Sequence, residues 1–384
     1  MKICFVTLEY PHPKTGTSGG IGTSILNLSK GLVQLGHAVS IVIYTQSEDA
    51  VFVENGITHY QVKSVKFKGL SFYLSQKKVE HLLNRLYQEQ KIDVVEFAEW
   101  TGFSSFIQPK CPVVVKLHGS DTYFCHLDER PVKWINKFHE KRALLKATAL
   151  LSVSRFTAAK TNEVFGLTKK FTIIPNGINM ELFSQNEELV EQNENVILYF
   201  GSLIRKKGLL ELPLIFNAVI DKKPNTKLVL VGKDVPDIKS GSSSTWNMMQ
   251  ALFTSEAIQK VTYLGGMPYA EIQKQIDLAT VCVFPSFAEA LPVSWIEAMA
   301  MQKAVVASNI GWAMEIIEDG VDGFLVNPKQ HQEYANKIID LLDNQTLRKE
   351  FGVNARMKIN DVFSIEVVAK QSKLFYKSVS KEIK

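Results

Sequence analysis

The chain has 384 residues, of which 46% are hydrophobic and 22% are charged, and its formal net charge is +5. This length is sufficient for two domains with separate cores, and the composition is that of an ordinary globular protein. The small positive charge excludes a strongly basic nucleic-acid-binding protein, although it would suit an anionic substrate or an anionic membrane surface.

The four cysteines have no metal-binding or redox spacing, and three of them lie in or beside apolar runs. This pattern indicates packed thiols in a reducing compartment. The chain begins directly with a strand-like segment, and no apolar run reaches the length of a membrane span. We therefore expect a cytoplasmic location.

The first apolar strand, expected over residues 3–8, leads into a loop that contains Gly19 and Gly20. An amphipathic helix and a second strand over 38–44 complete a βαβ unit. The glycine-rich first turn of such a unit is the usual place for backbone to approach a phosphate, although the dinucleotide fingerprint is incomplete. For Gly22, a tight turn without a ligand is the competing interpretation.

Polar residues follow the two strands expected over 94–97 and 113–117. Ligands bind at the carboxyl ends of strands in open α/β sheets. The residues found there are Glu99, Trp100, His118 and Asp121. Glu99 and Trp100 are therefore candidate ligand contacts. Taken alone, a histidine is more often a hydrogen-bonded structural residue, and Asp121 is equally suited to capping a turn.

Two segments of the first half combine aromatic and basic residues. Residues 63–73 have no helical period, whereas residues 131–146 form a basic amphipathic helix. Either segment could lie on an anionic membrane. A solvated loop is favoured for the first segment, and packing against the N-terminal sheet is favoured for the helix.

The clearest change in composition is the polar segment 184–195. We place the domain boundary there, which gives an N-terminal domain over 1–183 and a C-terminal domain over 196–362. The second domain begins with a buried strand that is followed by a turn with Arg205 and Lys207. Cations at this position would neutralise a departing diphosphate, whereas a solvated basic turn is the alternative.

The most informative stretch runs from residue 281 to 307 and reads as strand, loop, helix and strand. Pro292 suits the first position of the helix, and backbone N–H groups around Leu291, Val293 and Ser294 would form an anion site there. A diphosphate bound there would place a sugar near Glu289 and a ribose near Glu297, and carboxylates accept hydrogen bonds from hydroxyl pairs. Either glutamate alone would be an ordinary surface charge.

The pair Glu289 and Glu297 resembles the E-x7-E motif of retaining GT-B glycosyltransferases of the family 4, or group 1, type. The flanking segment 296–300 also matches, although Ala290-Leu291-Pro292 replaces the usual Gly-Phe or Gly-Leu. Two further elements are similar to the family: P-N-G-I-N at 175–179 and the turn at 201–208, where Ser202 replaces the usual arginine.

The resemblance implies an α/β GT-B fold, with two Rossmann-like domains facing across a deep cleft and the final helix, 363–384, crossing back to the N-terminal domain. It implies that His118 and Glu289 are catalytic, and with such an activity Glu99, Trp100 and Asp121 are candidate contacts on the acceptor side. The donor-binding residues that it implies are Gly19, Gly20, Arg205, Lys207, Met267, Glu289, Leu291, Pro292, Val293 and Glu297. No metal or other cofactor is expected, because the cations and the helix N-terminus would neutralise the diphosphate.

The implied activity is retaining transfer of a sugar from a nucleoside-diphosphate sugar to a saccharide or lipid-linked acceptor, in bacterial cell-surface polysaccharide or glycolipid synthesis. Peripheral contact with the inner face of the membrane stays open. A nucleotide-sugar epimerase and a non-catalytic sugar-binding protein of the same architecture remain alternatives. An NAD dehydrogenase is a poorer alternative, because the chain lacks the glycine fingerprint and the acidic residue after the second strand that such an enzyme would need. The nucleotide, sugar, acceptor and oligomeric state are not fixed by the sequence.

Overall fold

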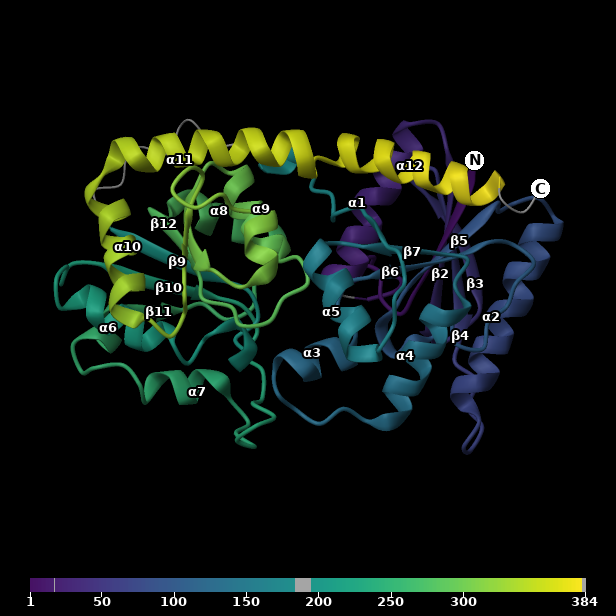
Figure 1. Cartoon of the computed structure of the whole chain (residues 1–384), viewed down its shortest axis with the longest axis horizontal. Helices are drawn as coiled ribbons and strands as arrows, with labels where there is room; N and C mark the ends of the chain where they lie inside the picture. The colour runs from purple at the N-terminus through teal and green to yellow at the C-terminus, as the bar shows by residue number, and fades with distance from the viewer. Residues whose placement is uncertain (17, 184–194, 382–384) are drawn as a thin grey trace. The chain divides into compact units, whose positions relative to one another are not determined.

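The computed structural model of the chain describes residues 1–16, 18–183 and 195–381 (Figure 1). These residues divide into unit 1, which comprises residues 1–179 and 363 onward, and unit 2, which comprises residues 180–362. The polar segment that suggested the domain boundary lies outside the described residues, except for Asn195. The short 3-10 helix η2 (Met180–Phe183) groups with unit 2, where the carbonyl of Phe183 accepts a hydrogen bond of 2.6 Å from Arg356.

Unit 1 contains an eight-stranded sheet in the order β3-β4-β2-β1-β5-β6-β7-β8. All neighbouring strands are parallel except β3, which pairs antiparallel with β4. The bounds are β1 (Lys2–Thr7), β2 (Ala38–Gln46), β3 (Ala50–Glu54), β4 (Ile57–Lys63), β5 (Val94–Ala98), β6 (Val113–Leu117), β7 (Ala149–Ser152) and β8 (Thr172–Ile173). Near-continuous apolar runs form the central strands because parallel strands are covered on both faces.

Helices cover both faces of the sheet of unit 1. Its helices are α1 (Gly20–Gln34), α2 (Ser71–Gln88), α3 (Asp121–Leu127), α4 (Trp134–Lys146), α5 (Arg155–Phe165) and α12 (Ile365–Lys381), with the 3-10 turn η1 (Trp100–Gly102). One core forms between the sheet and α2, and another forms between the sheet and both α1 and α12. Helix α12 lies beside α1 in Figure 1. The prediction that the C-terminal helix returns to the N-terminal unit is therefore confirmed.

Unit 2 contains a six-stranded parallel sheet in the order β11-β10-β9-β12-β13-β14. Its strands are β9 (Val196–Phe200), β10 (Lys227–Val231), β11 (Val261–Tyr263), β12 (Val281–Phe284), β13 (Ala304–Ser308) and β14 (Phe324–Val326). Its helices are α6 (Leu212–Ile220), α7 (Thr245–Gln250), α8 (Tyr269–Leu278), α9 (Val293–Ala300), α10 (His331–Asp343) and α11 (Gln345–Lys358). Shorter helical turns are η3 (Arg205–Lys207), η4 (Ala257–Lys260), η5 (Gly311–Glu315) and the π-turn η6 (Ile359–Phe363). Both units thus have the predicted Rossmann-like arrangement of a parallel sheet between helices.

One predicted helix of unit 2 is shorter than its sequence pattern indicates. The pattern predicts a helix from residue 246 to 258, but α7 ends at Gln250 and only the short turn η4 follows. The side chain of Asn217 donates to the carbonyl of Leu252 at 3.0 Å and accepts from the N–H of Thr254 at 3.0 Å. These tertiary hydrogen bonds satisfy the backbone in a non-helical conformation.

Within the described parts of the chain, every helix is too short or too polar to span a lipid bilayer.

Candidate functional site

The carboxyl ends of three neighbouring strands in unit 2 are lined by glycine backbone. Gly201 follows β9, Gly232 follows β10 and Gly265 lies two residues beyond β11. A Cβ atom on Gly232 would lie 1.9 Å from the carbonyl oxygen of Gly201, so only glycine allows these turns to approach each other. The turns leave bare backbone at the edge where open parallel sheets bind ligands.

An ion pair joins two of the predicted donor-site residues. The Nζ atom of Lys207 lies 3.1 Å from Oε1 of Glu289, and the hydroxyl of Ser286 donates to the same oxygen at 3.3 Å. Glu289 is 8% exposed. The turn that carries Lys207 packs directly on the loop that carries Glu289, because the N–H of Phe287 donates to the carbonyl of Lys206 at 2.8 Å.

Glu297 lies inside α9, where its carboxylate is buried. The hydroxyl of Tyr269, at the start of α8, donates a hydrogen bond to Oε1 of Glu297. Burial raises the pKa of Glu297 to about 7, against the opposing effects of the Tyr269 hydrogen bond and the charge of Lys207. Lys207 therefore acts electrostatically on both glutamates, and the structure brings these three predicted donor-binding residues together.

The start of α9 lies next to this cluster and was predicted to bind an anion. Pro292 precedes the helix and provides no side-chain cap, and the first turn holds no acidic residue. The helix dipole and its first N–H groups favour a negative charge at this end. Leu291 and Pro292 are buried and Val293 is half-buried, so they can contribute backbone and an apolar wall.

The side chain of Arg205 pairs with an acid that the sequence analysis did not identify. Its guanidinium donates two hydrogen bonds to Asp237, at 2.9 and 2.7 Å. The arginine lowers the pKa of Asp237 well below its usual range. Arg205 thus ties the loop after β10 to η3, and a contact with diphosphate would compete with this pair. Met267, another of the predicted donor-binding residues, is half-buried after β11.

In unit 1, Glu99 holds the backbone at His118. Its carboxylate is 2% exposed, and Oε1 accepts a hydrogen bond of 2.6 Å from the N–H of His118. Among the described residues, Oε2 has no hydrogen-bond partner. Burial raises the pKa of Glu99 to about 8. Its observed role is to position the loop after β6, whereas the predicted contact with an acceptor stays a prediction.

The surroundings of His118 favour the neutral form of its imidazole. Burial, reinforced by the nearby charge of Lys116, lowers the pKa of His118 well below its ordinary value. A neutral ring can exchange hydrogen bonds with a sugar hydroxyl without adding a positive charge. This protonation state is compatible with the role that the sequence resemblance gives to His118.

The remaining predicted residues of unit 1 lie at helix starts. Asp121 is the first residue of α3, and Ser120 is the N-cap of this helix. The N–H of Asp121 donates to Oε1 of Glu140 at 3.0 Å. Trp100 is half-buried in η1. Gly19 is the N-cap of α1 and Gly20 is its first residue.

A carboxylate also lies at the start of α1. Oε1 of Glu9 accepts a hydrogen bond of 3.3 Å from the N–H of Gly22. A Cβ on Gly22 would lie 2.7 Å from the carbonyl oxygen of Glu9, so the close packing of this turn explains why glycine is needed there. No pattern in the sequence pointed to Glu9, because its approach to the helix depends on the turn of the intervening loop.

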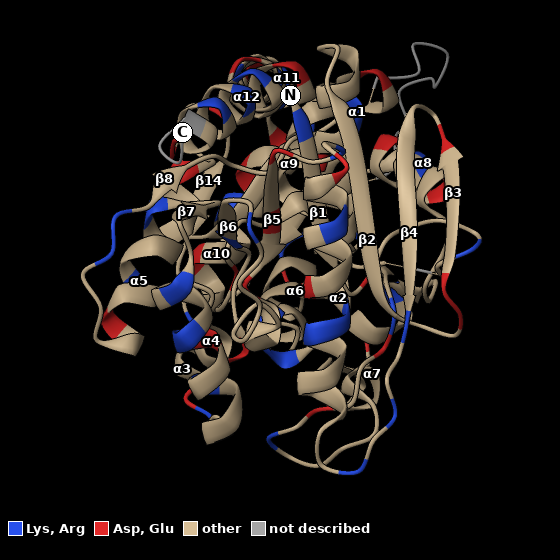
Figure 2. Cartoon of the chain, turned by 90° about the vertical axis from the view of Figure 1, so that its right-hand side faces the viewer, with Lys and Arg blue, Asp and Glu red and all other residues tan. Residues whose placement is uncertain are grey.

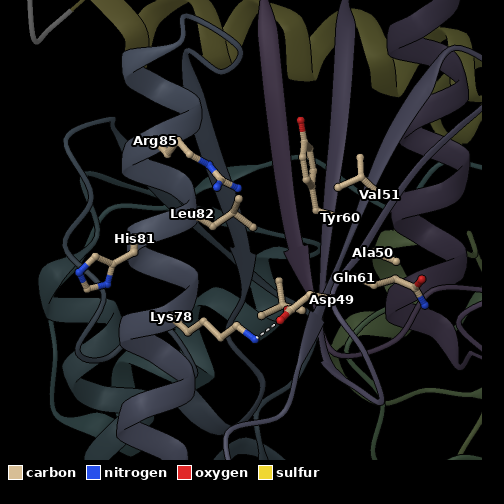
Figure 3. A pocket seen from close by; sticks show the side chains of 10 residues that line it. Asp49, Ala50, Val51, Tyr60, Gln61, Lys78, His81, Leu82 and Arg85 are labelled. Carbon is tan, nitrogen blue, oxygen red and sulfur yellow. Dashed lines mark hydrogen bonds and ion pairs between the residues drawn. The ribbon is translucent and has the colours of Figure 1, made fainter.

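The pocket shown in Figure 3 lies elsewhere in unit 1. It is a groove of about 600 Å³ between α2 and the β3–β4 hairpin, with Lys78, His81 and Arg85 on one side and Tyr60 on its floor. The Nζ atom of Lys78 pairs with Asp49 at 2.7 Å. None of the predicted site residues lines this groove.

Two family models together match nearly the whole chain. The model described as "Glycosyltransferase Family 4" matches residues 18–182, and the model described as "Glycosyl transferases group 1" matches residues 181–358. The second matched region contains Lys207, Glu289 and Glu297.

Curated proteins and solved structures show the same similarity. The chain is 23% identical to the alpha-monoglucosyldiacylglycerol synthase of Acholeplasma laidlawii over 93% of both chains. It is 24% identical to a capsular polysaccharide biosynthesis glycosyltransferase of Staphylococcus aureus, over 63% of this chain and 65% of that protein. Among solved structures, HepE of Anabaena in complex with UDP and glucose superposes with a TM-score of 0.76, at 20% identity over 98% of this chain and 100% of that one.

Proposed function

Because the chain belongs to the group 1 and family 4 glycosyltransferases and has their GT-B fold, we propose that it transfers a sugar, with retention of anomeric configuration, from a UDP-sugar to a saccharide or lipid-linked acceptor. UDP is the first donor nucleotide to test because the structural neighbour HepE was solved with UDP and glucose. The observation that carries the proposal is the cluster of Lys207, Glu289 and Glu297 beside the start of α9 in unit 2.

The cluster supplies the groups that a nucleotide-sugar requires. The α9 N-terminus and the ammonium of Lys207 would neutralise the diphosphate. Glu289 would accept hydrogen bonds from hydroxyls of the donor sugar, and Glu297 would accept them from the ribose. Both carboxylates have two acceptor oxygens, which suits adjacent hydroxyl groups. The glycine turns after β9 and β10 would let the backbone approach the phosphates.

Retention of configuration follows if the acceptor attacks from the face that the diphosphate leaves. The bond between C1 of the sugar and the phosphate oxygen breaks while the acceptor oxygen bonds to C1 on the same side. The acceptor proton passes to the departing phosphate oxygen, so no strongly basic side chain is needed. Charge on the leaving group increases in the transition state, and Lys207 would stabilise it there. In this proposal, His118 keeps the catalytic role that the family resemblance implies.

We propose that the reaction needs no metal ion, since Lys207 and the helix N-terminus supply positive charge at the diphosphate. Arg205 would add to this charge if its pair with Asp237 opens. The names of the two relatives support a bacterial cell-surface polysaccharide or glycolipid as the product. An enzyme with a lipid-linked acceptor would work at the inner face of the membrane, which makes cytoplasmic location with peripheral membrane contact part of the proposal.

The first experiment is a thermal shift of the purified chain with UDP, GDP, ADP or NAD, each with and without EDTA. A ligand that binds only the native state raises the melting temperature. We expect UDP to raise it and EDTA to leave the shift unchanged. A shift with GDP or ADP alone would reassign the donor, loss of the shift in EDTA would overturn metal independence, and no shift with any nucleoside diphosphate would refute the donor site.

Two alternatives keep the same architecture. A nucleotide-sugar epimerase would isomerise the UDP-sugar without any acceptor, and a non-catalytic protein would bind it without forming product. The family matches and relatives favour neither. Release of UDP that depends on added acceptor would exclude both.

A further inference from the structure

Several large apolar side chains on one part of unit 1 are exposed to solvent and are not packed into the core of the unit. Trp134 is 77% exposed, although the sequence pattern predicted that α4 would bury its apolar residues. Phe138 and Leu145 on the same helix are 46% and 48% exposed. These three residues are separated by four and seven positions, so at about 100° per residue they lie within roughly 40° of one another. They form one apolar stripe on the side of α4 that faces solvent.

The opposite side of α4 attaches the helix to unit 1. Its buried residues are Glu140, Ala143 and Leu144. The carboxylate of Glu140 accepts hydrogen bonds from the N–H groups of Asp121 and Thr122, at 3.0 and 3.2 Å. The helix is therefore turned so that an acid is inside and a tryptophan is outside. That orientation reverses the usual preference of these residue types.

A second segment continues the apolar stripe. Phe67, Leu70 and Tyr73, at the turn before α2 and in its first residues, are 57%, 49% and 42% exposed. The ring of Phe106 joins this segment to α4, since its centroid lies 5.7 Å from that of Tyr73 and 6.3 Å from that of Phe138. We name these exposed apolar residues, together with the exposed lysines of the same two segments, the aromatic–lysine surface. Contiguous exposed apolar area of this kind marks an interaction site.

The lysines of this surface are not used in ion pairs with the described residues of the chain. Lys66, Lys68, Lys133 and Lys137 are exposed, and in the described chain none of the four is ion-paired. Residues 63–76 contain no acid, and residues 131–146 contain only Glu140, which is buried at the start of α3. Figure 2 colours the lysines and arginines of α2 and α4 blue. The surface therefore combines apolar side chains with uncompensated positive charge.

We propose that the aromatic–lysine surface docks the protein on a bilayer of anionic phospholipids. The proposal rests on the peripheral membrane contact proposed above and names the surface and the lipid class. Aromatic side chains insert at the level of the headgroups, while lysines reach the anionic phosphates around them. A second copy of the chain is a poorer occupant, because a two-fold contact would place these lysines against the same lysines.

The test is sedimentation of the full-length chain with vesicles. We expect binding to vesicles of equal parts phosphatidylglycerol and phosphatidylcholine, weaker binding in high salt, and little binding to phosphatidylcholine alone. Trp134→Ala/Phe138→Ala and Lys133→Gln/Lys137→Gln should each lower the partition coefficient about tenfold. The matched control is Val51→Ala/Val53→Ala, which removes exposed apolar side chains of unit 1 outside the surface and should bind like the wild type.

Equal binding by the wild type and the Trp134→Ala/Phe138→Ala variant would overturn the proposal. So would absence of binding to the anionic vesicles, or concentration-dependent self-association that this variant abolishes. Melting curves of each variant, with and without UDP, separate this outcome from the proposed function. A variant that keeps its UDP shift but loses vesicle binding supports the membrane-binding surface independently of donor binding. Vesicle binding by a wild-type protein that shows no UDP shift would support the surface and refute the donor site.

Discussion

Glu289 is the residue on which the proposed chemistry depends most directly. Glu289→Gln keeps the shape of the side chain but removes the charge that pairs with Lys207 at 3.1 Å. We expect transfer to fall by at least about 100-fold while the fold is retained, since interactions with the reacting sugar are those that count in the transition state. Steady-state kinetics and a melting curve measure the two effects.

The matched control for this change is Ser202→Ala. Ser202 lies on the turn that carries Lys207, and its backbone carbonyl accepts a hydrogen bond of 3.0 Å from Tyr199, which the substitution leaves in place. The variant should retain near-normal activity. Near-normal activity of Glu289→Gln would instead remove the residue from the proposed mechanism.

Glu297 has a consequence for stability that depends on pH. Its folded pKa of about 7 lies above its ordinary value of 4.5, so the folded state holds a proton more tightly than the unfolded state. Stability from this group is therefore complete below pH 4.5 and is lost as pH rises to 7. The loss is on the order of 3 kcal/mol. The glutamine in Glu297→Gln cannot ionise, so this variant does not lose stability in that way.

The expected result is a stability difference that changes with pH. Relative to the wild type, Glu297→Gln should become more stable between pH 5 and about pH 7.5, and the difference should then level off. Urea unfolding at several pH values measures it, and other titrating groups cancel in the comparison. A difference that stays constant with pH would contradict the raised pKa. The same variant should bind UDP more weakly, because an amide offers only one acceptor oxygen.

The sequence reveals the residues of unit 2 better than those of unit 1, for a physical reason. Glu289 and Glu297 are close in the chain and share one strand–loop–helix element, so their spacing alone predicts that they lie together. The contacts of Glu99 with His118 and of Glu9 with Gly22 bridge separate turns. Asp237 pairs with Arg205 across 32 positions. Such pairs depend on how turns fold over one another, which local patterns do not encode.

At the scale of elements, the turn after β9 must fit tightly against the loop after β12. Gly208 has φ of +73°, and a Cβ on it would lie 1.8 Å from the carbonyl oxygen of Pro285. Gly208→Ala should therefore destabilise unit 2 by more than about 2 kcal/mol and weaken UDP binding, because Lys207 is the adjacent residue. Chemical unfolding and a UDP titration provide the measurements.

Gly320→Ala separates backbone strain from collision. Gly320 has a similar φ of +75°, but no atom lies within 4 Å of an added Cβ. This control should cost only about 1 kcal/mol, the strain of a left-handed alanine. Equal losses in the two variants would show that the contact with Pro285 is unimportant.

Some elements were predictable and others were not. Strands β12 and β13 were expected from their buried apolar runs, and the structure confirms them. The β3–β4 hairpin was not predicted, although its turn Asn55-Gly56, with φ of 50° and 75°, is a known hairpin signal. The apolar positions of α4 were expected to be buried. Periodicity identifies a stripe on a helix but does not say whether protein or another surface covers it.

At the scale of the whole molecule, helix α12 is part of unit 1 although it follows unit 2 in the sequence. Tyr376 on α12 is fully buried, and its hydroxyl donates to Oε2 of Glu96 in β5 at 2.6 Å, across 280 positions of sequence. Burial raises the pKa of Glu96, and the Lys116 charge and this hydrogen bond oppose the shift. Unit 1 is thus complete only after the last helix has been added.

Tyr376→Phe tests this arrangement because it removes one hydroxyl and leaves the ring in place. The carboxylate of Glu96 would stay buried without its donor, which should cost unit 1 about 1–3 kcal/mol. Hydrogen exchange should then rise in β5 and α1, while unit 2 should exchange as before. Tyr334→Phe is the matched control, since the hydroxyl of Tyr334 donates to the carbonyl of Val306 at 2.6 Å within unit 2. It should raise exchange in β13 and α10 instead. If Tyr376→Phe accelerated exchange equally in both units, α12 would support the whole chain and not unit 1 alone.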